Sequence, residues 1–185
     1  MAFPKAYADV VARLRVPFGF VLVVAFAWFS DPRSGSLAIG LPVSLLGLGM
    51  RAWAAGYLAK NQCLATGGPY AHTRNPLYLG TLLVAVGLVI ASRSLGLALV
   101  FGCVFLLIYL PVIELEEQHL RKLFPEYAAY ANRTPRFWPR VHGGTSLSAF
   151  RWDLYWKNQE YKALMGFLAG TAFLIWKSSP DMLRP

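Results

Sequence analysis

The chain has 185 residues, of which 56% are hydrophobic and only 15% are charged. An average soluble domain has roughly 45–50% apolar and about 25% charged residues, so this composition excludes an ordinary soluble domain. A helix that crosses the apolar core of a bilayer needs about 20 residues, and the chain has room for about five such helices. We therefore expect one all-α, multi-span membrane domain over residues 1–185.

Lysine and arginine number 18 against 9 acidic residues, which gives a formal net charge of +9. The basic residues lie between the apolar runs and do not gather in one arm, as the positive-inside bias produces, so a nucleic-acid partner is not expected. The two cysteines, Cys63 and Cys103, form no CxxC pair. His72, His119 and His142 lack the spacing of metal ligands, so we expect no metal site and interpret them as interfacial residues without a catalytic part.

Five apolar runs are candidates for membrane helices. The expected spans are residues 11–29, 37–58, 77–91, 95–113 and 161–176. The first run also resembles a signal peptide, because basic residues precede it and Ala25-Phe26-Ala27 stands near its end. We expect a span there, since the rest of the chain is itself a membrane protein that needs no cleaved signal.

Five spans with a cytosolic N-terminus place most basic residues inside. They leave only Arg33, Arg93, Lys177 and Arg184 outside. This asymmetry predicts that the N-terminus is cytosolic and the C-terminus is outside. It also places two polar stretches, residues 60–76 and 114–160, on the cytosolic face, where we expect the chemistry.

A glycine turn precedes the third expected span. Gly67-Gly68-Pro69 favours a tight turn, and Asn75-Pro76 is typical of a helix N-cap followed by proline at the first helical position. The free amide groups of such a helix start bind anions, and Arg74 beside them is a bidentate donor. The alternative is an interfacial loop in which Arg74 faces lipid phosphates and Tyr70 and Tyr78 belong to an aromatic belt.

Three glutamates, Glu114, Glu116 and Glu117, crowd the end of the fourth span. Carboxylates at the edge of an apolar bundle are costly unless a cationic group pairs with them. Two interpretations stay open at this point. Either the glutamates form a site with cationic partners, or they lie on a solvated turn in which Glu117 pairs with Arg121 one helical turn later.

In residues 133–140, arginines alternate with aromatic residues, and prolines prevent a helix. Such a segment suits a loop at the depth of the lipid headgroups. It either closes over a pocket, with Arg133 and Trp138 as substrate-binding residues, or rests on anionic lipid.

Together these motifs resemble the isoprenylcysteine carboxyl methyltransferase family and the related phospholipid N-methyltransferases, over residues 45–139. The matching residues are Pro69-Tyr70, Arg74-Asn75-Pro76-Leu77-Tyr78-Leu79-Gly80, and Glu116-Glu117 with Leu120, Phe124, Tyr127, Tyr130 and Pro135. The resemblance implies a small integral membrane enzyme that takes S-adenosylmethionine from the cytosol. Such an enzyme methylates a lipid-borne acceptor reached from the bilayer and leaves S-adenosylhomocysteine as the product.

The resemblance also implies where the cofactor binds. Its contacts fall on Gln62, Cys63, Leu64, Ala65, Tyr70, Asn75, Pro76, Leu77, Tyr78 and Glu116. Arg74 and the helix start suit the carboxylate of the cofactor, and Glu116 suits its ammonium group. Methyl transfer from a sulfonium is a one-step displacement, so the protein mainly aligns the reactants in a dry pocket. An amine or hydroxyl acceptor also needs a base, for which Glu117 is the candidate, whereas a carboxylate acceptor needs none.

Two departures from the family pattern bear on these expectations. The family usually has histidine where this chain has Asn75, although an amide can still cap and donate. Isoprenylcysteine enzymes carry an arginine shortly before the glutamate pair to hold the carboxylate of the substrate, and residues 112–115 supply none. The acceptor therefore stays open between a phospholipid amine, a prenylcysteine-like carboxylate and another amphiphile.

Two rival functions remain. The membrane sterol and enone reductases, which bind NADPH, look similar in their C-terminal halves but usually continue the tyrosine-glycine motif with glutamate, where Thr81 follows Gly80 here. A non-enzymatic scaffold or lipid-binding membrane protein would bind no nucleotide-sized cofactor. Methyl transfer from S-adenosylmethionine is the function that the motifs favour.

Overall fold

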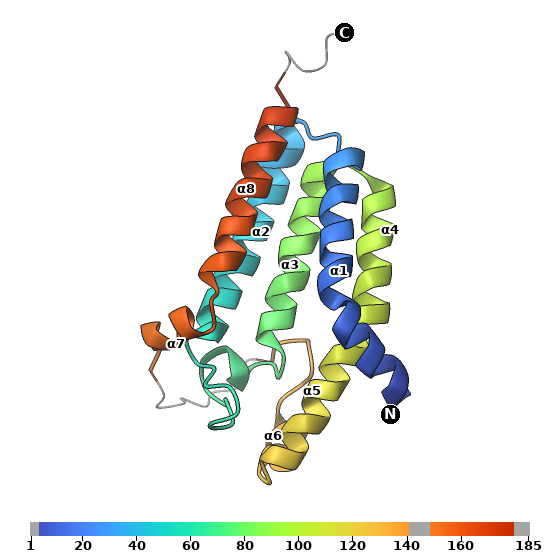
Figure 1. The fold of residues 1–185 in the computed structure, drawn as a ribbon. Helices are drawn as coiled ribbons and strands as arrows, with labels where there is room; N and C mark the ends of the chain where they lie inside the picture. The colour runs from blue at the N-terminus through green and yellow to red at the C-terminus, as the bar shows by residue number, and fades with distance from the viewer. Residues whose placement is uncertain (1–3, 141–148, 180–185) are drawn as a thin grey trace.

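The computed structural model describes residues 4–140 and 149–179, which form helices and loops without any strand. The long helices stand side by side (Figure 1). They are α1 (Lys5–Phe29), α2 (Ser34–Ala55), α3 (Pro76–Ser92), the continuous series α4 (Leu95–Val104), η2 (Phe105–Tyr109) and α5 (Leu110–Leu123), and α8 (Tyr161–Lys177). The prediction of an all-α architecture is confirmed.

Not every long helix has the length of a membrane span. By length and composition, α2 and the continuous helix Leu95–Leu123 qualify, and α1 is a third candidate if its two parts, bent by 53°, count as one span. The bend falls at Pro17, which cannot donate the helical hydrogen bond at its position. α3 and α8 have 17 residues each, a rise of about 25 Å against an apolar core of about 30 Å. The count of five spans therefore stays a prediction.

A π-helical turn, η2, interrupts the helix between α4 and α5 just before Pro111. Proline has no N–H for the carbonyl four residues earlier, which here belongs to Leu107. The hydroxyl of Tyr7 on α1 donates to this carbonyl at 2.7 Å and satisfies it. α1 is thereby tied to the point where the apolar helix α4 gives way to the amphipathic helix α5.

Helices α2 and α3 approach each other closely because small residues line both faces. A Cβ at Gly40 would lie 2.3 Å from the carbonyl oxygen of Gly87, which leaves no room for any side chain. One turn after Gly40 in the same helix, Ser44 Oγ donates to the carbonyl of Val84 in α3 at 3.0 Å. Such small-residue contacts are a common way to pack helices inside membranes. This contact fixes both ends of the polar connection, residues 56–75.

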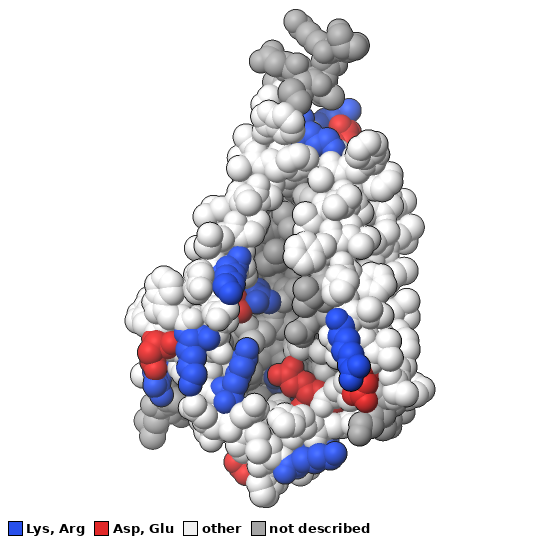
Figure 2. Space-filling view, in the orientation of Figure 1, with Lys and Arg blue, Asp and Glu red and all other residues white. Residues whose placement is uncertain are grey.

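Most of the remaining polar structure lies at the end of the bundle that carries the start of α1 (Figure 1). It comprises the 56–75 connection with the short turn η1 (Gly68–Ala71), the C-terminal part of α5, α6 (Tyr127–Arg133) and α7 (Trp152–Lys157). Figure 2 shows that the charged side chains gather mainly at this end, with a small group at the opposite end and a largely uncharged belt between them. The two polar stretches thus share one end of the bundle, and the cytosolic placement of that end stays a prediction.

Replacing Gly40 with valine is expected to lower the free energy of unfolding by roughly 1–3 kcal/mol, because the new side chain overpacks the contact with α3. Gly49→Val is the matched control, since a Cβ at Gly49 in the same helix meets no described atom within 4 Å. Thermal unfolding of the detergent-solubilised protein measures both variants. Equal melting temperatures for the two would contradict the close packing of α2 on α3.

Reporter fusions at Ser34, Gly68, Ser94 and the C-terminus test the five-span topology. Five crossings predict outside, inside, outside and outside in that order, because the connections alternate between the two ends of the bundle (Figure 1). A cytosolic signal from the C-terminal reporter would remove the five-span topology.

Candidate active site

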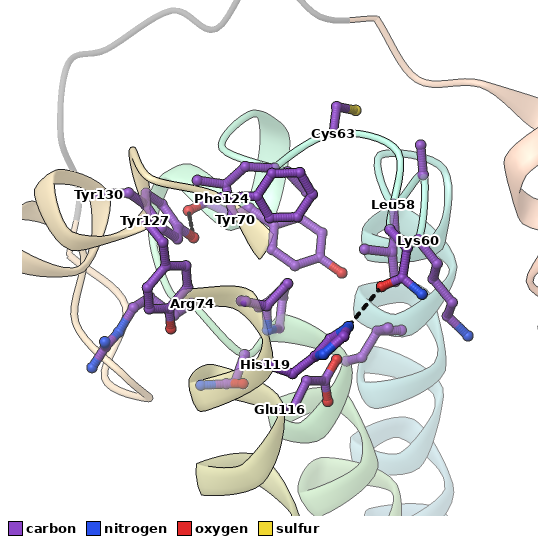
Figure 3. Close-up of a pocket in the computed structure, with 18 of the residues that line it drawn as sticks. Leu58, Lys60, Cys63, Tyr70, Arg74, Glu116, His119, Phe124, Tyr127 and Tyr130 are labelled. Carbon is purple, nitrogen blue, oxygen red and sulfur yellow. Dashed lines mark hydrogen bonds between the residues drawn. The ribbon is translucent and has the colours of Figure 1, made fainter. Parts of the chain in front are cut away.

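A cleft lies where the 56–75 connection meets α5 and α6 (Figure 3). It holds about 800 Å³ of empty space, part of which is open to solvent. The walls come from residues 58–61, 63–65, Tyr70, residues 74–78, Glu116, His119, Leu120, Phe124, Tyr127 and Tyr130. We call this space the first cleft.

The glycine turn folds as predicted and brings an aromatic side chain to the first cleft. Gly68 has φ +54°, a conformation that favours glycine, and a side chain there would meet the ring of Tyr57 at 2.7 Å. The turn continues into η1, which places Tyr70 in the cleft wall. The hydroxyl of Tyr130 donates to the backbone carbonyl of Tyr70 at 2.8 Å and so ties this loop to α6.

Helix α3 begins at Pro76 after the N-cap residue Asn75, as predicted. The Asn75 side chain, however, does not cap the helix. Its Nδ2 donates to Glu117 Oε1 at 3.1 Å and to the carbonyl of Arg136 at 3.3 Å. The first turn of α3 therefore keeps amide groups that no side-chain cap uses, and its residues line the first cleft. A helix start of this kind attracts anions.

Glu117 lies at the centre of a buried ionic cluster and is 4% exposed. Arg136 donates to it from Nε at 3.2 Å and from Nη2 at 2.7 Å, and Arg74 Nη1 lies 3.6 Å from Oε2. The glutamate thus pairs with these two arginines and not with Arg121, whose guanidinium lies over the ring of Tyr127. Of the two interpretations of the glutamates, the one with cationic partners agrees with this geometry.

This position argues against Glu117 as a general base, and the role of Glu117 stays a prediction. Both of its carboxylate oxygens already accept hydrogen bonds, and Glu117 does not line the first cleft. A base must reach the proton that it takes up. The geometry assigns Glu117 to positioning Arg74 and Asn75 on the cleft wall.

Two buried polar atoms of the first cleft have no hydrogen-bond partner among the described residues. They are Nε of Arg74 and the hydroxyl of Tyr127. Burial raises the pKa of the Tyr127 hydroxyl, and the charge of Glu117 adds to this effect, while the charge and the proximity of the Arg74 side chain lower the pKa. An unsatisfied buried donor costs about 1–3 kcal/mol. The anion-binding feature that the cleft itself presents is the uncapped start of α3, with Arg74 beside it in the wall.

Glu116 supplies the opposite charge. It lies on the exposed side of α5, where its Oε2 accepts from the hydroxyl of Tyr78 at 2.8 Å. Figure 3 shows Glu116 in the wall at a distance from Arg74. His119 also lines the cleft, with Nε2 3.3 Å from Asn61 Oδ1, so its interpretation as a merely interfacial residue was incomplete.

The structure gathers most of the predicted cofactor residues. Those in the wall of the first cleft are Cys63, Leu64, Ala65, Tyr70, Asn75, Pro76, Leu77, Tyr78 and Glu116, together with Arg74. Gln62 is not among the lining residues. The remaining wall residues, such as Lys60 and Phe124, were not assigned to the cofactor, although Phe124, Tyr127 and Tyr130 belong to the motif that carried the resemblance.

The proposed substrate residues are not brought to the cleft. Arg133 Nε donates to the carbonyl of Ala129 in its own helix, and Trp138 is 85% exposed. Their segment runs beside residues 72–75, where Arg74 N donates to the Pro135 carbonyl at 2.9 Å and Arg140 N to the His72 carbonyl at 3.1 Å. The segment therefore clamps this loop and supplies Arg136 to Glu117, rather than closing over the cleft. His142 lies outside the described residues.

A second cleft adjoins the first. The two share Leu58, Lys60, Leu77, Tyr78 and Glu116. From this shared wall the second cleft extends between α2, α3 and α8, and its polar lining includes Arg51 and Glu160. Arg51 could not be identified from the sequence, because a single arginine near the end of an apolar run gives no signal of its partner.

The described residues contain no group of three or more histidine, cysteine, aspartate or glutamate side chains that could hold a metal ion.

Comparisons with known proteins bear on this site. The chain is 42% identical over 118 residues to the cobalt-zinc-cadmium resistance protein CzcN of Cupriavidus metallidurans, an alignment that covers 63% of this chain and 51% of the relative. It is 40% identical over 107 residues to the nickel-cobalt-cadmium resistance protein NccN of Alcaligenes xylosoxydans xylosoxydans, with 55% and 50% covered. The chain thus spans about half the length of these curated relatives. No solved structure matches it significantly.

Residues 41–127 match the family model described as phospholipid methyltransferase. The match includes most of α2, all of α3 and α5, and the 56–75 connection, and it covers most of the wall of the first cleft. Over these residues the chain matches the phospholipid methyltransferase family, in agreement with the resemblance of its motifs.

Proposed function

We propose that this chain transfers a methyl group from S-adenosylmethionine to a membrane amphiphile. One observation carries the proposal. The first cleft has the uncapped start of α3 with Arg74 in one part of its wall and a separate carboxylate, Glu116, in another. This pair of opposite charges is complementary to the zwitterionic amino-acid end of the cofactor, and most of the cleft wall lies within the residues that match the phospholipid methyltransferase family.

The other residues of the first cleft fit the rest of the cofactor. Arg74 and the start of α3 would hold its carboxylate and Glu116 its ammonium group, while Tyr70 and Phe124 give aromatic surface for the adenosine and sulfonium groups. When bound, S-adenosylmethionine supplies an electrophilic methyl group. The chain contributes binding, alignment and the exclusion of water, which are the main requirements of a one-step displacement.

The names of the two relatives concern resistance to metal ions. A role in metal resistance is therefore a second candidate function for this chain. It is compatible with methyl transfer. The two functions can be distinguished by the growth of a metal-sensitive bacterial host that expresses either the unmodified chain or its Glu116→Gln variant. Growth restored equally by both proteins would uncouple resistance from the proposed cofactor site.

Replacing Glu116 with glutamine is expected to weaken the binding of S-adenosylhomocysteine by about 1.5–3 kcal/mol, or roughly 10- to 150-fold, because a hydrogen bond to a charged group is lost. Isothermal titration calorimetry of the purified protein measures the affinity. Glu126→Gln is the matched control, since Glu126 is exposed and lies outside the cleft wall. Binding of NADPH, with no response to S-adenosylhomocysteine, would instead support a membrane reductase.

Replacing Glu117 with glutamine is expected to destabilise the protein by about 3–5 kcal/mol, since it leaves two arginines at a buried site without their carboxylate. Thermal unfolding measures this loss, again with Glu126→Gln as the control. The result would be different if Glu117 were a base. In that case the variant would keep its melting temperature and its affinity for S-adenosylhomocysteine but lose methyl transfer.

A further inference from the structure

The second cleft contains an ion pair that the proposed chemistry does not use. Arg51, in the last turns of the apolar helix α2, donates to Glu160 Oε2 from Nε at 3.0 Å and to Oε1 from Nη2 at 2.7 Å, and it also bonds Thr81 of α3. The Arg51 and Glu160 side chains are 22% and 10% exposed. Ionisable groups at the edge of a membrane bundle are costly and usually mark a functional site.

The charges that line the second cleft do not balance. Besides the Arg51–Glu160 pair, Lys60 and Lys162 lie in its wall, and neither lies within ion-pair distance of a described acidic group. Lys162 Nζ bonds only the neutral Gln159 Oε1, at 2.6 Å. The remaining carboxylate, Glu116, accepts from Tyr78 on the wall shared with the first cleft. The second cleft thus carries excess positive charge, which is complementary to an anionic ligand.

An apolar groove continues from this charged site along α8. Figure 2 shows the molecule hollowed between α8 and the side formed by α1 and α4, within the uncharged belt. On α8, Gly166 and Gly170 follow Lys162 at intervals of four residues, so all three share one helix face. A Cβ at either glycine would meet no described atom within 4 Å. This face therefore leaves open space beside the lysine.

We propose that the second cleft binds the phosphate-bearing head of the acceptor amphiphile, with Arg51, Lys60 and Lys162 as its anion-binding residues and the groove along Gly166 and Gly170 as the path of its tail. This inference rests on the proposed function and adds a residue-level site for the acceptor. Arginine binds phosphate bidentately, and lysines at the rim add charge. Because both clefts share Tyr78 and Glu116, an amphiphile held here places the end of its head against the first cleft.

The test is the binding of dihexanoyl phosphatidic acid to the purified full chain in a neutral detergent, measured by calorimetry. Lys60→Gln and Lys162→Gln are each expected to weaken binding roughly fivefold, the effect of about one basic charge near an anionic head. Lys157→Gln removes the same charge from an exposed position outside the second cleft and is expected to leave the affinity unchanged. Arg51→Lys keeps the positive charge but loses the guanidinium group that donates two parallel hydrogen bonds. It is expected to weaken binding more than Lys60→Gln or Lys162→Gln does.

Three results would overturn the site. Neutral dihexanoylglycerol that binds as tightly as the phosphatidic acid would show that the head is not recognised. An equal loss in Lys157→Gln would reduce the effect to net charge, and competition by inorganic phosphate at equal affinity would assign the site to free phosphate instead of a lipid. The affinity for S-adenosylhomocysteine is measured on Lys162→Gln, whose residue lies outside the wall of the first cleft, and is expected to stay unchanged. Absence of that cofactor binding in the unmodified chain, with phosphatidic acid still bound, would contradict the proposed function and leave the lipid site standing.

Discussion

The ion pairs of Glu117 are the constraint on which the site depends. A carboxylate that is 4% exposed must be paired, because an isolated buried charge costs far more than a folded domain can supply. Its partners, Arg74 and Arg136, come from segments that lie 43 residues before and 19 residues after it. The ion pairs of this one carboxylate therefore hold the start of α3, the helix α5 and the segment after α6 together. The first cleft is the space left beside that junction.

The helix packing is tight on one side of the clefts and open on the other. The glycines of α2 and α3 bring those helices into backbone contact, so the connection between them starts and ends at fixed points. Helix α8 is held to α2 by polar bonds, among them Arg51 with Glu160 and Asn158 Nδ2 with the carbonyls of Ala55 and Leu58. These polar bonds lie near the start of α8, and its far end packs against α1 and α2 through Leu174 and Lys177. The middle of the helix borders the hollow seen in Figure 2. The rigid contact and the open groove thus lie next to each other.

The helices and turns could be predicted from local backbone preferences, whereas the ion pairs between distant residues could not. The start of α3 at Pro76 and the positive φ of Gly68 follow from backbone sterics, which the residue types alone determine. The partners of Glu117 depend on which distant arginines the fold brings next to it. The sequence suggested only its helical neighbour Arg121, so the pairing with Arg136 was not predicted. Asn75 was identified as an N-cap by position, yet its side chain turns to Glu117 because the buried carboxylate needs the donor more than the helix start does.

The adjacent glutamates show how one helix serves both needs. Successive residues of an α-helix point about 100° apart, so Glu116 and Glu117 cannot face the same surroundings. Glu117 points into the ionic cluster and is fully paired there. Glu116 accepts a hydrogen bond from the Tyr78 hydroxyl and lies on the wall that both clefts share. The buried member fixes the rotation of α5, and that rotation aims its neighbour at the clefts. A substitution at Glu117 therefore acts on ligands through the orientation of Glu116 and Arg74, without contact of its own.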